Sequence, residues 1–344
     1  MVKVLFLILF FLPTMAQEKF SMYVQNIAGS DQSFKMIPMQ GGSFLIGSDS
    51  LEKGRDIDEG PSKKVVVSDF WMGETEVTYD IFQLFLDETK DPSPKADGIT
   101  RPSQPYIDFT LGMGKQGNFP ANSMQQYSAL MFCKWLYKKT GIFYRLPTET
   151  EWEYTAKQSY TPSQMTDSTL IREYEWFAEN AKEKYHQVAS KKSNILGIYD
   201  LLGNVAEWTL DQYDDTFYDK ISDGSKDPMA FKTKRYPVTV RGGSYKSTLR
   251  ELRPSNRTKS DPLWNRRDPQ MPKSKWWNAD APFIGLRLVR PLKDLTSKEV
   301  EQFFQSVLTQ VANSQIQNAP KWPIFDYLST KCIYFERAIN LNNL

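Results

Sequence analysis

Four positions close together in the chain carry oxygen atoms at a spacing suited to one hard cation. Asp200 and Glu207 are carboxylates, and Gly203 and Val205 lie between them. Because Ca2+ takes carboxylate and backbone carbonyl oxygens, two side chains and two carbonyls within this segment could converge on a single ion. The alternative is that Asp200 and Glu207 only cap turns or bridge arginines. The residues alone leave both interpretations open.

Soft and nitrogen ligands are scarce. The chain has one histidine, His186, and two cysteines, Cys133 and Cys332. This excludes a zinc finger, a multi-histidine iron site and a dense disulfide framework. We expect His186 to be solvated or structural, since it has no second imidazole with which to share a metal. Cys133 falls in a predicted helix, so it is either a buried thiol or, in an oxidising compartment, a partner for Cys332.

The composition describes a folded protein rich in aromatic rings. Among 344 residues, 40% are hydrophobic and 14% aromatic, and the formal net charge is only +2. So much apolar surface argues against a mainly disordered chain, and so little net charge argues against a nucleic-acid-binding protein.

The amino terminus has the layout of a secretory signal peptide. Lys3 precedes an apolar run over residues 4–12, and small residues end at Ala16. Such a short apolar run is not a spanning helix, which needs about 20 residues. We therefore expect cleavage near Ala16, no transmembrane helix in the mature chain, and a secreted or periplasmic protein. The alternative is a buried amino-terminal helix.

The elements that must position the candidate ligands are short. Strand patterns cover residues 36–39, 41–47, 64–72, 238–241 and 283–289, the first two joined by a glycine turn. Helical spacing covers 79–86 with Thr78 as its cap, about 123–138, and a helix opened by the capping box of Thr148 and Glu151. Residues 160–172 read as loop.

The last fifty residues have a different pattern. Thr296 and Glu299 form another capping box, and apolar residues then recur at helical spacing from Val300 to Val311. This predicts an amphipathic helix that packs on the main domain or binds a partner. The expected organisation is a signal peptide over 1–16, a lead-in over 17–33, one domain over 34–291, and a helical extension over 292–344.

Several ordered segments resemble a known family. They are 41–47 (GGSFLIG), 144–154 (YRLPTETEWEY), 197–208 (GIYDLLGNVAEW), 241–245 (RGGSY) and 285–287 (GLR). Together they resemble the formylglycine-generating enzymes, or sulfatase-modifying factors. The resemblance implies a single, loop-rich α+β domain of the C-type-lectin-like kind. Within the family, residues 261–277 are similar to the branch that includes gliding-motility and type IX secretion lipoproteins, although this chain lacks the lipidated cysteine.

The resemblance also implies metal sites. Catalytic relatives hold calcium at positions matching the side chains of Asp200 and Glu207 and the backbone oxygens of Gly203 and Val205. We find no residue match for the family's other calcium site, so we expect one Ca2+ at most.

The family's oxidase chemistry uses copper held by two cysteine thiolates. The matching positions here are Ser247 and Leu252, and neither side chain suits soft copper. Ala206 also stands where the family commonly has the tryptophan that helps to wall the substrate groove. We therefore expect no copper and no catalytic residues.

Three functions remain open. The preferred one is a non-catalytic scaffold or binding component of an envelope, secretion or gliding-type assembly, whose partners would be proteins of that machinery. The others are a formylglycine-generating oxidase acting on sulfatase cysteines and a carbohydrate-binding module. Rings and cations over residues 264–277 could bind sugar or nucleic acid, but a structural lattice is the favoured interpretation.

Overall fold

In the computed structural model, the described residues are 20–87, 89, 98–103, 105 and 107–309. They form a mixed helix-and-sheet domain with long connecting loops, as expected for the α+β class. None of the helices within these ranges is long and apolar enough to cross a membrane. Cys332, the predicted signal peptide and the end of the carboxyl-terminal extension lie outside the described residues.

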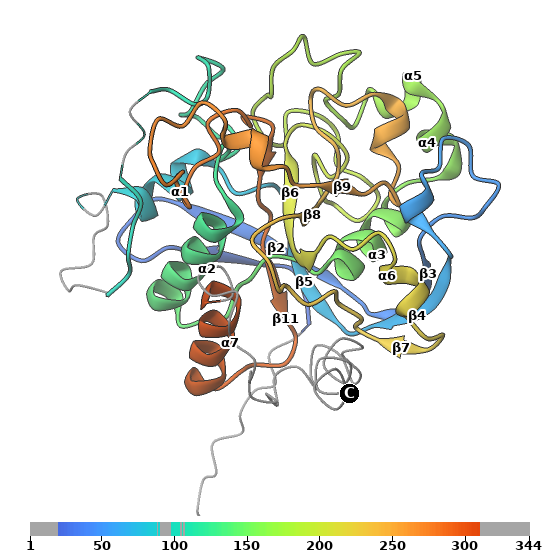
Figure 1. The fold of residues 1–344 in the computed structure, drawn as a ribbon, viewed down its shortest axis with the longest axis horizontal. Coiled ribbons are helices and arrows are strands. Elements are labelled where there is room, and N and C mark those ends of the chain that lie inside the picture. The colour runs from blue at the N-terminus through green and yellow to red at the C-terminus, as the bar shows by residue number, and fades with distance from the viewer. Residues whose placement is uncertain (1–19, 88, 90–97, 104, 106, 310–344) are drawn as a thin grey trace, which may run out of the picture.

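Three small sheets make up the β structure (Figure 1). The first has the order β1-β2-β5-β11, with β1 Tyr23–Asn26, β2 Ser33–Met39, β5 Phe70–Gly73 and β11 Val289–Pro291, all antiparallel neighbours. The second has the order β3-β4-β7, with β3 Gly42–Ile46, β4 Lys63–Val67 and β7 Ser225–Lys226. The third has the order β10-β6-β8-β9, with β6 Ala206–Gln212, β8 Val238–Arg241, β9 Thr258–Lys259 and β10 Ile284–Gly285.

Three strand predictions joined segments that belong to different sheets. β2 and β3 do not form a hairpin, and the predicted strand 64–72 divides into β4 and β5. The division occurs where the backbone N–H of Gly41 donates to the Asp69 carboxylate at 2.7 Å. A Cβ on Gly41 would lie only 2.2 Å from the carbonyl oxygen of Val67, so this close approach requires glycine. The predicted strand 283–289 divides in the same way into β10 and β11.

Seven α-helices and three short 3-10 turns are present in the described ranges. The helices are α1 Tyr79–Leu86, α2 Gln126–Thr140, α3 Glu149–Ser159, α4 Pro162–Thr166, α5 Ser168–Ile171, α6 Phe217–Lys220 and α7 Ser297–Thr309. The 3-10 turns are η1 Ile57–Glu59, η2 Leu249–Leu252 and η3 Pro262–Asn265.

The predicted caps explain where two helices begin. Thr78 Oγ1 accepts the N–H of Ile81 at the start of α1. The Thr148 hydroxyl and the Glu151 carboxylate form a reciprocal capping box at α3.

Two helical predictions were wrong in part. α2 begins three residues late, because Ser123 has a left-handed φ of 60°. Most sides of this helix are buried, and Lys134 stays partly exposed. Residues 160–172 contain α4 and α5 where loop was expected. The missed signal was a further capping box, Thr161 with Gln164, which encloses Pro162 at the first helical position.

The carboxyl-terminal helix packs on its own domain. Helix α7 lies beside α2 (Figure 1), and Val300, Phe303 and Phe304 are almost completely buried. Phe143 makes edge-to-face ring contacts with both phenylalanines, at centroid distances of 5.0 and 5.8 Å. The simpler of the two interpretations of this amphipathic helix is therefore confirmed.

Candidate functional site

The predicted calcium loop precedes and enters β6. Asp200 and Asn204 both have left-handed backbone conformations, with φ of 52° and 45°. Between them Gly203 has a φ of 154°, and a Cβ there would lie 2.4 Å from the carbonyl oxygen of Trp176. Glycine is therefore required at this point, and the sharp bend aims the carboxylates on either side of it inward. Asp200 and Glu207 are both buried.

Glu207 has strong partners for both of its carboxylate oxygens. Arg287 Nε donates to Oε1 at 2.7 Å, and Trp152 Nε1 donates to Oε2 at 2.8 Å. Arg287 also donates to the carbonyl oxygens of Gly73, Tyr199 and Asp200 at 2.9–3.2 Å. Glu207 therefore bridges an arginine, as one of the two interpretations of the sequence proposed. Arg287 in turn joins the loop to Gly73 at the end of β5.

Asp200 is bonded on one oxygen only. Its Oδ2 accepts the N–H of Ala189 at 2.7 Å, whereas Oδ1 is buried and has no hydrogen-bond partner. A buried carboxylate oxygen without a donor is costly unless the group is protonated or contacts a cation. In the described part of the chain, no three His, Cys, Asp or Glu side chains converge closely enough to hold a metal ion. Calcium here would therefore need backbone carbonyls as well as carboxylates, which is compatible with the orphaned oxygen of Asp200.

Two further carboxylates complete this buried cluster, and the sequence did not predict them. Glu76 follows β5, and Glu175 follows α5. Burial, then repulsion by Asp200, raises the pKa of Glu76 well above its usual range and that of Glu175 to about 8. Burial likewise raises the pKa of Asp200 to about 6 and also raises the pKa of Glu207. Nothing in the local sequence marks Glu76 or Glu175, because each reaches the cluster from a distant segment.

The two positions matching the copper ligands lie together in space. A Cβ on Gly243 would be 3.1 Å from both Ser247 Oγ and the Cδ2 atom of Leu252. The hydroxyl of Ser247 accepts the N–H of Ser244 at 3.1 Å, and Leu252 is fully buried in an apolar cluster. One oxygen and one methyl group therefore occupy a place that would need two sulfur atoms, and this donor set does not fit Cu(I).

The surroundings of these positions are structural. Ala206 and Tyr245 are buried, and the Tyr245 ring packs edge-to-face on Tyr185 at 6.0 Å. The backbone N–H of Tyr245 donates to the Asn204 carbonyl, which joins this turn to the calcium loop. Cys133 is buried in α2 and has no disulfide partner among the described residues, and burial raises the pKa of its thiol.

His186 has a packing role. Its ring stacks on Trp176 at a centroid distance of 3.7 Å, and its Nε2 contacts the Ala181 carbonyl at 2.9 Å. Burial lowers the pKa of His186, which favours the neutral ring. The expectation of a structural histidine is confirmed.

The predicted lattice of rings and cations is also engaged internally. Trp264 packs on Phe283 at 5.5 Å, and Arg267 pairs with Asp280. Trp277 Nε1 donates to the carbonyl oxygen of Ser103 at 3.0 Å. These contacts hold the 261–277 segment against the domain, and a cavity of about 370 Å³ remains beside Trp276 and Trp277.

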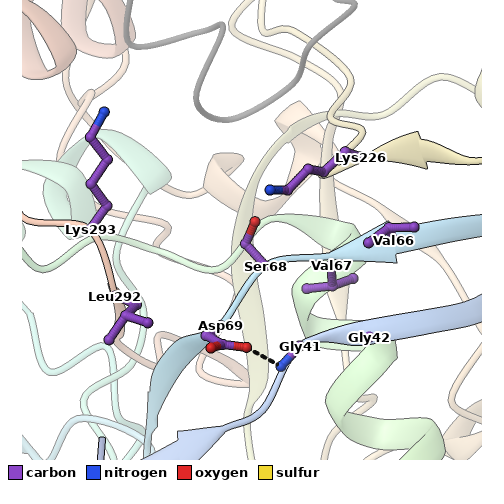
Figure 2. A pocket seen from close by; sticks show the side chains of 9 residues that line it. All are labelled: Gly41, Gly42, Val66, Val67, Ser68, Asp69, Lys226, Leu292 and Lys293. Atoms are coloured by element: carbon purple, nitrogen blue, oxygen red, sulfur yellow. Dashed lines mark hydrogen bonds between the residues drawn. The ribbon is translucent and has the colours of Figure 1, made fainter. Parts of the chain in front are cut away.

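A second hollow lies where β4 ends. This groove of about 520 Å³ is bordered by the Gly41–Asp69 contact and by Lys226 and Lys293 (Figure 2). None of the predicted calcium-ligand or copper-matching positions lines it.

Comparison with known proteins identifies the family. The family model described as a sulfatase-modifying factor enzyme 1-like domain matches residues 25–269, and the chain belongs to this family. An inactive C-alpha-formylglycine-generating enzyme 2 from Bos taurus is 28% identical over 228 residues, covering 54% of this chain and 73% of that protein. The structure of PvdO from Pseudomonas aeruginosa is 26% identical, with a TM-score of 0.57, and covers 75% of this chain and 94% of that one.

A third relative is much longer. The serine/threonine-protein kinase Pkn1 of Chlamydia trachomatis is 28% identical over 242 residues, which cover 66% of this chain. This chain spans only 36% of the length of that kinase. Similarity to a relative named as inactive fits a family member that lacks the copper ligands.

Proposed function

We propose that this protein is a non-catalytic member of the sulfatase-modifying factor family that acts as a binding or scaffold component. One observation carries the proposal: Ser247 and Leu252 stand side by side at Gly243 where the oxidase needs two thiolates. The surrounding turns and buried pairs are intact, so the domain folds without the donors that activate oxygen. The inactive bovine relative supports the same interpretation.

We further propose that the protein works outside the cytoplasm in an envelope, secretion or gliding-type assembly. The signal-peptide pattern ending at Ala16 and the likeness of residues 261–277 to gliding and type IX secretion lipoproteins support this. The mature protein would then begin near Gln17. Mass spectrometry of the protein recovered from the envelope and medium tests this, and an intact Met1 would contradict it.

A single calcium ion is part of the same proposal, as a structural ion of the Asp200–Glu207 loop. The orphaned Oδ1 of Asp200 and the tight bend at Gly203 support it. The ion would fix the loop that contacts Tyr245 through Asn204, and it would have no part in a reaction.

The experiment for the non-catalytic proposal is a direct assay. Copper-loaded protein is incubated with oxygen and a cysteine-containing sulfatase-motif peptide, with an active formylglycine-generating enzyme run in parallel. We expect no aldehyde product by mass spectrometry. Turnover that disappears when copper is removed would refute the proposal.

The scaffold proposal has its own test. Tagged mature protein is cross-linked in envelopes and compared with an unrelated exported domain carrying the same tag. A reproducible set of envelope proteins captured by this chain alone supports the proposal. Identical capture profiles for the two baits would contradict it.

A further inference from the structure

The cavity beside Trp276 and Trp277 has the dimensions of a small-molecule site. Its volume of about 370 Å³ falls within the roughly 300–1,000 Å³ that is usual for ligand pockets. Trp276, Trp277 and Phe109 form aromatic walls, and Trp277 packs against Phe109 at a centroid distance of 6.1 Å. None of the calcium-loop or copper-matching positions lines this cavity. A ligand here would therefore bind away from the sites described above.

The first polar group in the wall is the hydroxyl of Ser274. This side chain is buried, at 8% exposed, and its oxygen accepts the backbone N–H groups of Trp276 and Trp277 at 3.1 and 3.4 Å. Two accepted bonds use the acceptor capacity of a hydroxyl oxygen. The hydroxyl proton has no acceptor among the described residues. Ser274 can therefore donate one hydrogen bond to a ligand in the cavity.

The second polar group is the carboxylate of Asp268, which is 5% exposed. Its Oδ2 atom accepts the side-chain amide of Asn265 at 3.1 Å and the backbone N–H of Ser274 at 2.6 Å. Its Oδ1 atom accepts only the backbone N–H of Gln270, at 3.0 Å. Because a carboxylate offers about four acceptor positions, one position remains at Oδ1. Asp268 is thus fixed by the backbone and can still accept a hydrogen bond from a ligand.

The charges around the cavity cancel. Arg101 and Arg267 in the lining are positive, Asp268 is negative, and Arg267 pairs with Asp280. These side chains offer no net charge to attract a phosphate, a nucleic acid or an acidic peptide. A purely apolar ligand is also unsuited, because it would leave the polar groups of Ser274 and Asp268 buried without partners. The chemistry of the walls calls for an uncharged ligand that is both polar and apolar.

We propose that this cavity binds a neutral saccharide. The face of an aromatic ring is electron-rich, so the C–H groups on one face of a sugar ring pack against it. Sugar hydroxyls both donate and accept, which matches the acceptor position of Asp268 and the proton of Ser274. The amide of Gln270, which is exposed and lines the cavity, adds a further donor and acceptor.

A peptide strand fits the same cavity less well. The lining residues belong to none of the described strands, so they offer no sheet edge for a peptide to join. Saccharide binding here is also independent of the missing copper ligands. Its failure would leave the proposed non-catalytic function unchanged.

The test is titration of the full chain with neutral trisaccharides, namely maltotriose, cellotriose, mannotriose and chitotriose, by calorimetry and tryptophan fluorescence. Trigalacturonic acid is the anionic comparison. At least one neutral trisaccharide should bind one-to-one and change the fluorescence, and trigalacturonic acid should bind more weakly. Absence of binding by all the neutral sugars would overturn the proposal, and so would tightest binding by trigalacturonic acid.

Three variants locate the binding. Trp276→Ala removes an aromatic wall and should weaken the Kd by about tenfold or more, as is common for aromatic anchors. Gln270→Ala should weaken it by about threefold or more through a lost hydrogen bond, and should fold normally because Gln270 is exposed. Arg266→Ala, an exposed neighbour outside the lining, should leave the Kd unchanged. Wild-type affinity in Gln270→Ala would contradict this site, even if Trp276→Ala proved unfolded in a thermal melt.

Discussion

Replacing Phe304 by alanine tests whether α7 is part of the domain core. The Phe304 side chain is 0% exposed and contacts the rings of Phe143 and Phe303. Removing a fully buried phenylalanine ring costs about 3–5 kcal/mol, from lost transfer free energy and the cavity left behind. This would be a large fraction of the roughly 5–15 kcal/mol by which a domain is stable. We therefore expect Phe304→Ala to lower the free energy of unfolding by that amount.

The assay is urea unfolding followed by tryptophan fluorescence, with Glu301→Ala as the control on the same helix. The Glu301 side chain is 55% exposed and pairs with Lys134 at 2.7 Å. Its loss should cost less than about 1 kcal/mol, as is usual for exposed pairs. If Phe304→Ala also costs under about 1 kcal/mol, the helix is not integral to the fold and the alternative of a partner-binding helix returns.

Two further predictions concern pH and helix capping. Burial, then the Arg235 charge, lowers the pKa of Lys232 to about 7. The unfolded state then binds more protons between about pH 7 and 10, so stability should rise with pH across that window. The measurement is urea unfolding at several pH values. The rise in stability should disappear in Lys232→Met and remain in the control Lys234→Met, whose side chain is exposed. An unchanged rise in Lys232→Met would contradict a lowered pKa of Lys232 as its cause. Thr148→Ala should cost about 1 kcal/mol by loss of the bond to the Glu151 N–H at 3.1 Å; a thermal melt identical to wild type would show that the cap is dispensable.

Local sequence patterns were sufficient to predict several helices and strands. They also predicted two of the four carboxylates of the buried acidic cluster, Asp200 and Glu207. Thr78 and Thr148 cap helices through bonds that span three residues, so sequence shows both partners at once. The same holds for Asp200 and Glu207, which one short loop brings to the same buried site. The mixed, loop-rich class followed from the family motifs.

Long-range contacts account for what was missed. The division of segment 64–72 depends on Gly41 meeting Asp69, and no pattern within either segment reveals that contact. Glu76 and Glu175 enter the acidic cluster from loops far from residue 200. The sequence left open whether Glu207 pairs with an arginine, and it did not indicate which one. The pair with Arg287 is visible only in the fold, where β6 lies against the 285–288 segment.

Copper affinity tests the central claim most directly. The full chain, in a Cys133→Ser, Cys332→Ser background, is titrated with Cu(I) against a chromogenic chelator. A matched variant adds Ser247→Cys and Leu252→Cys, which restores two sulfur atoms beside Gly243. We predict that the first protein does not compete with the chelator and that the second acquires a tight one-to-one site. Stoichiometric Cu(I) retention by the protein that keeps Ser247 and Leu252 would contradict the account.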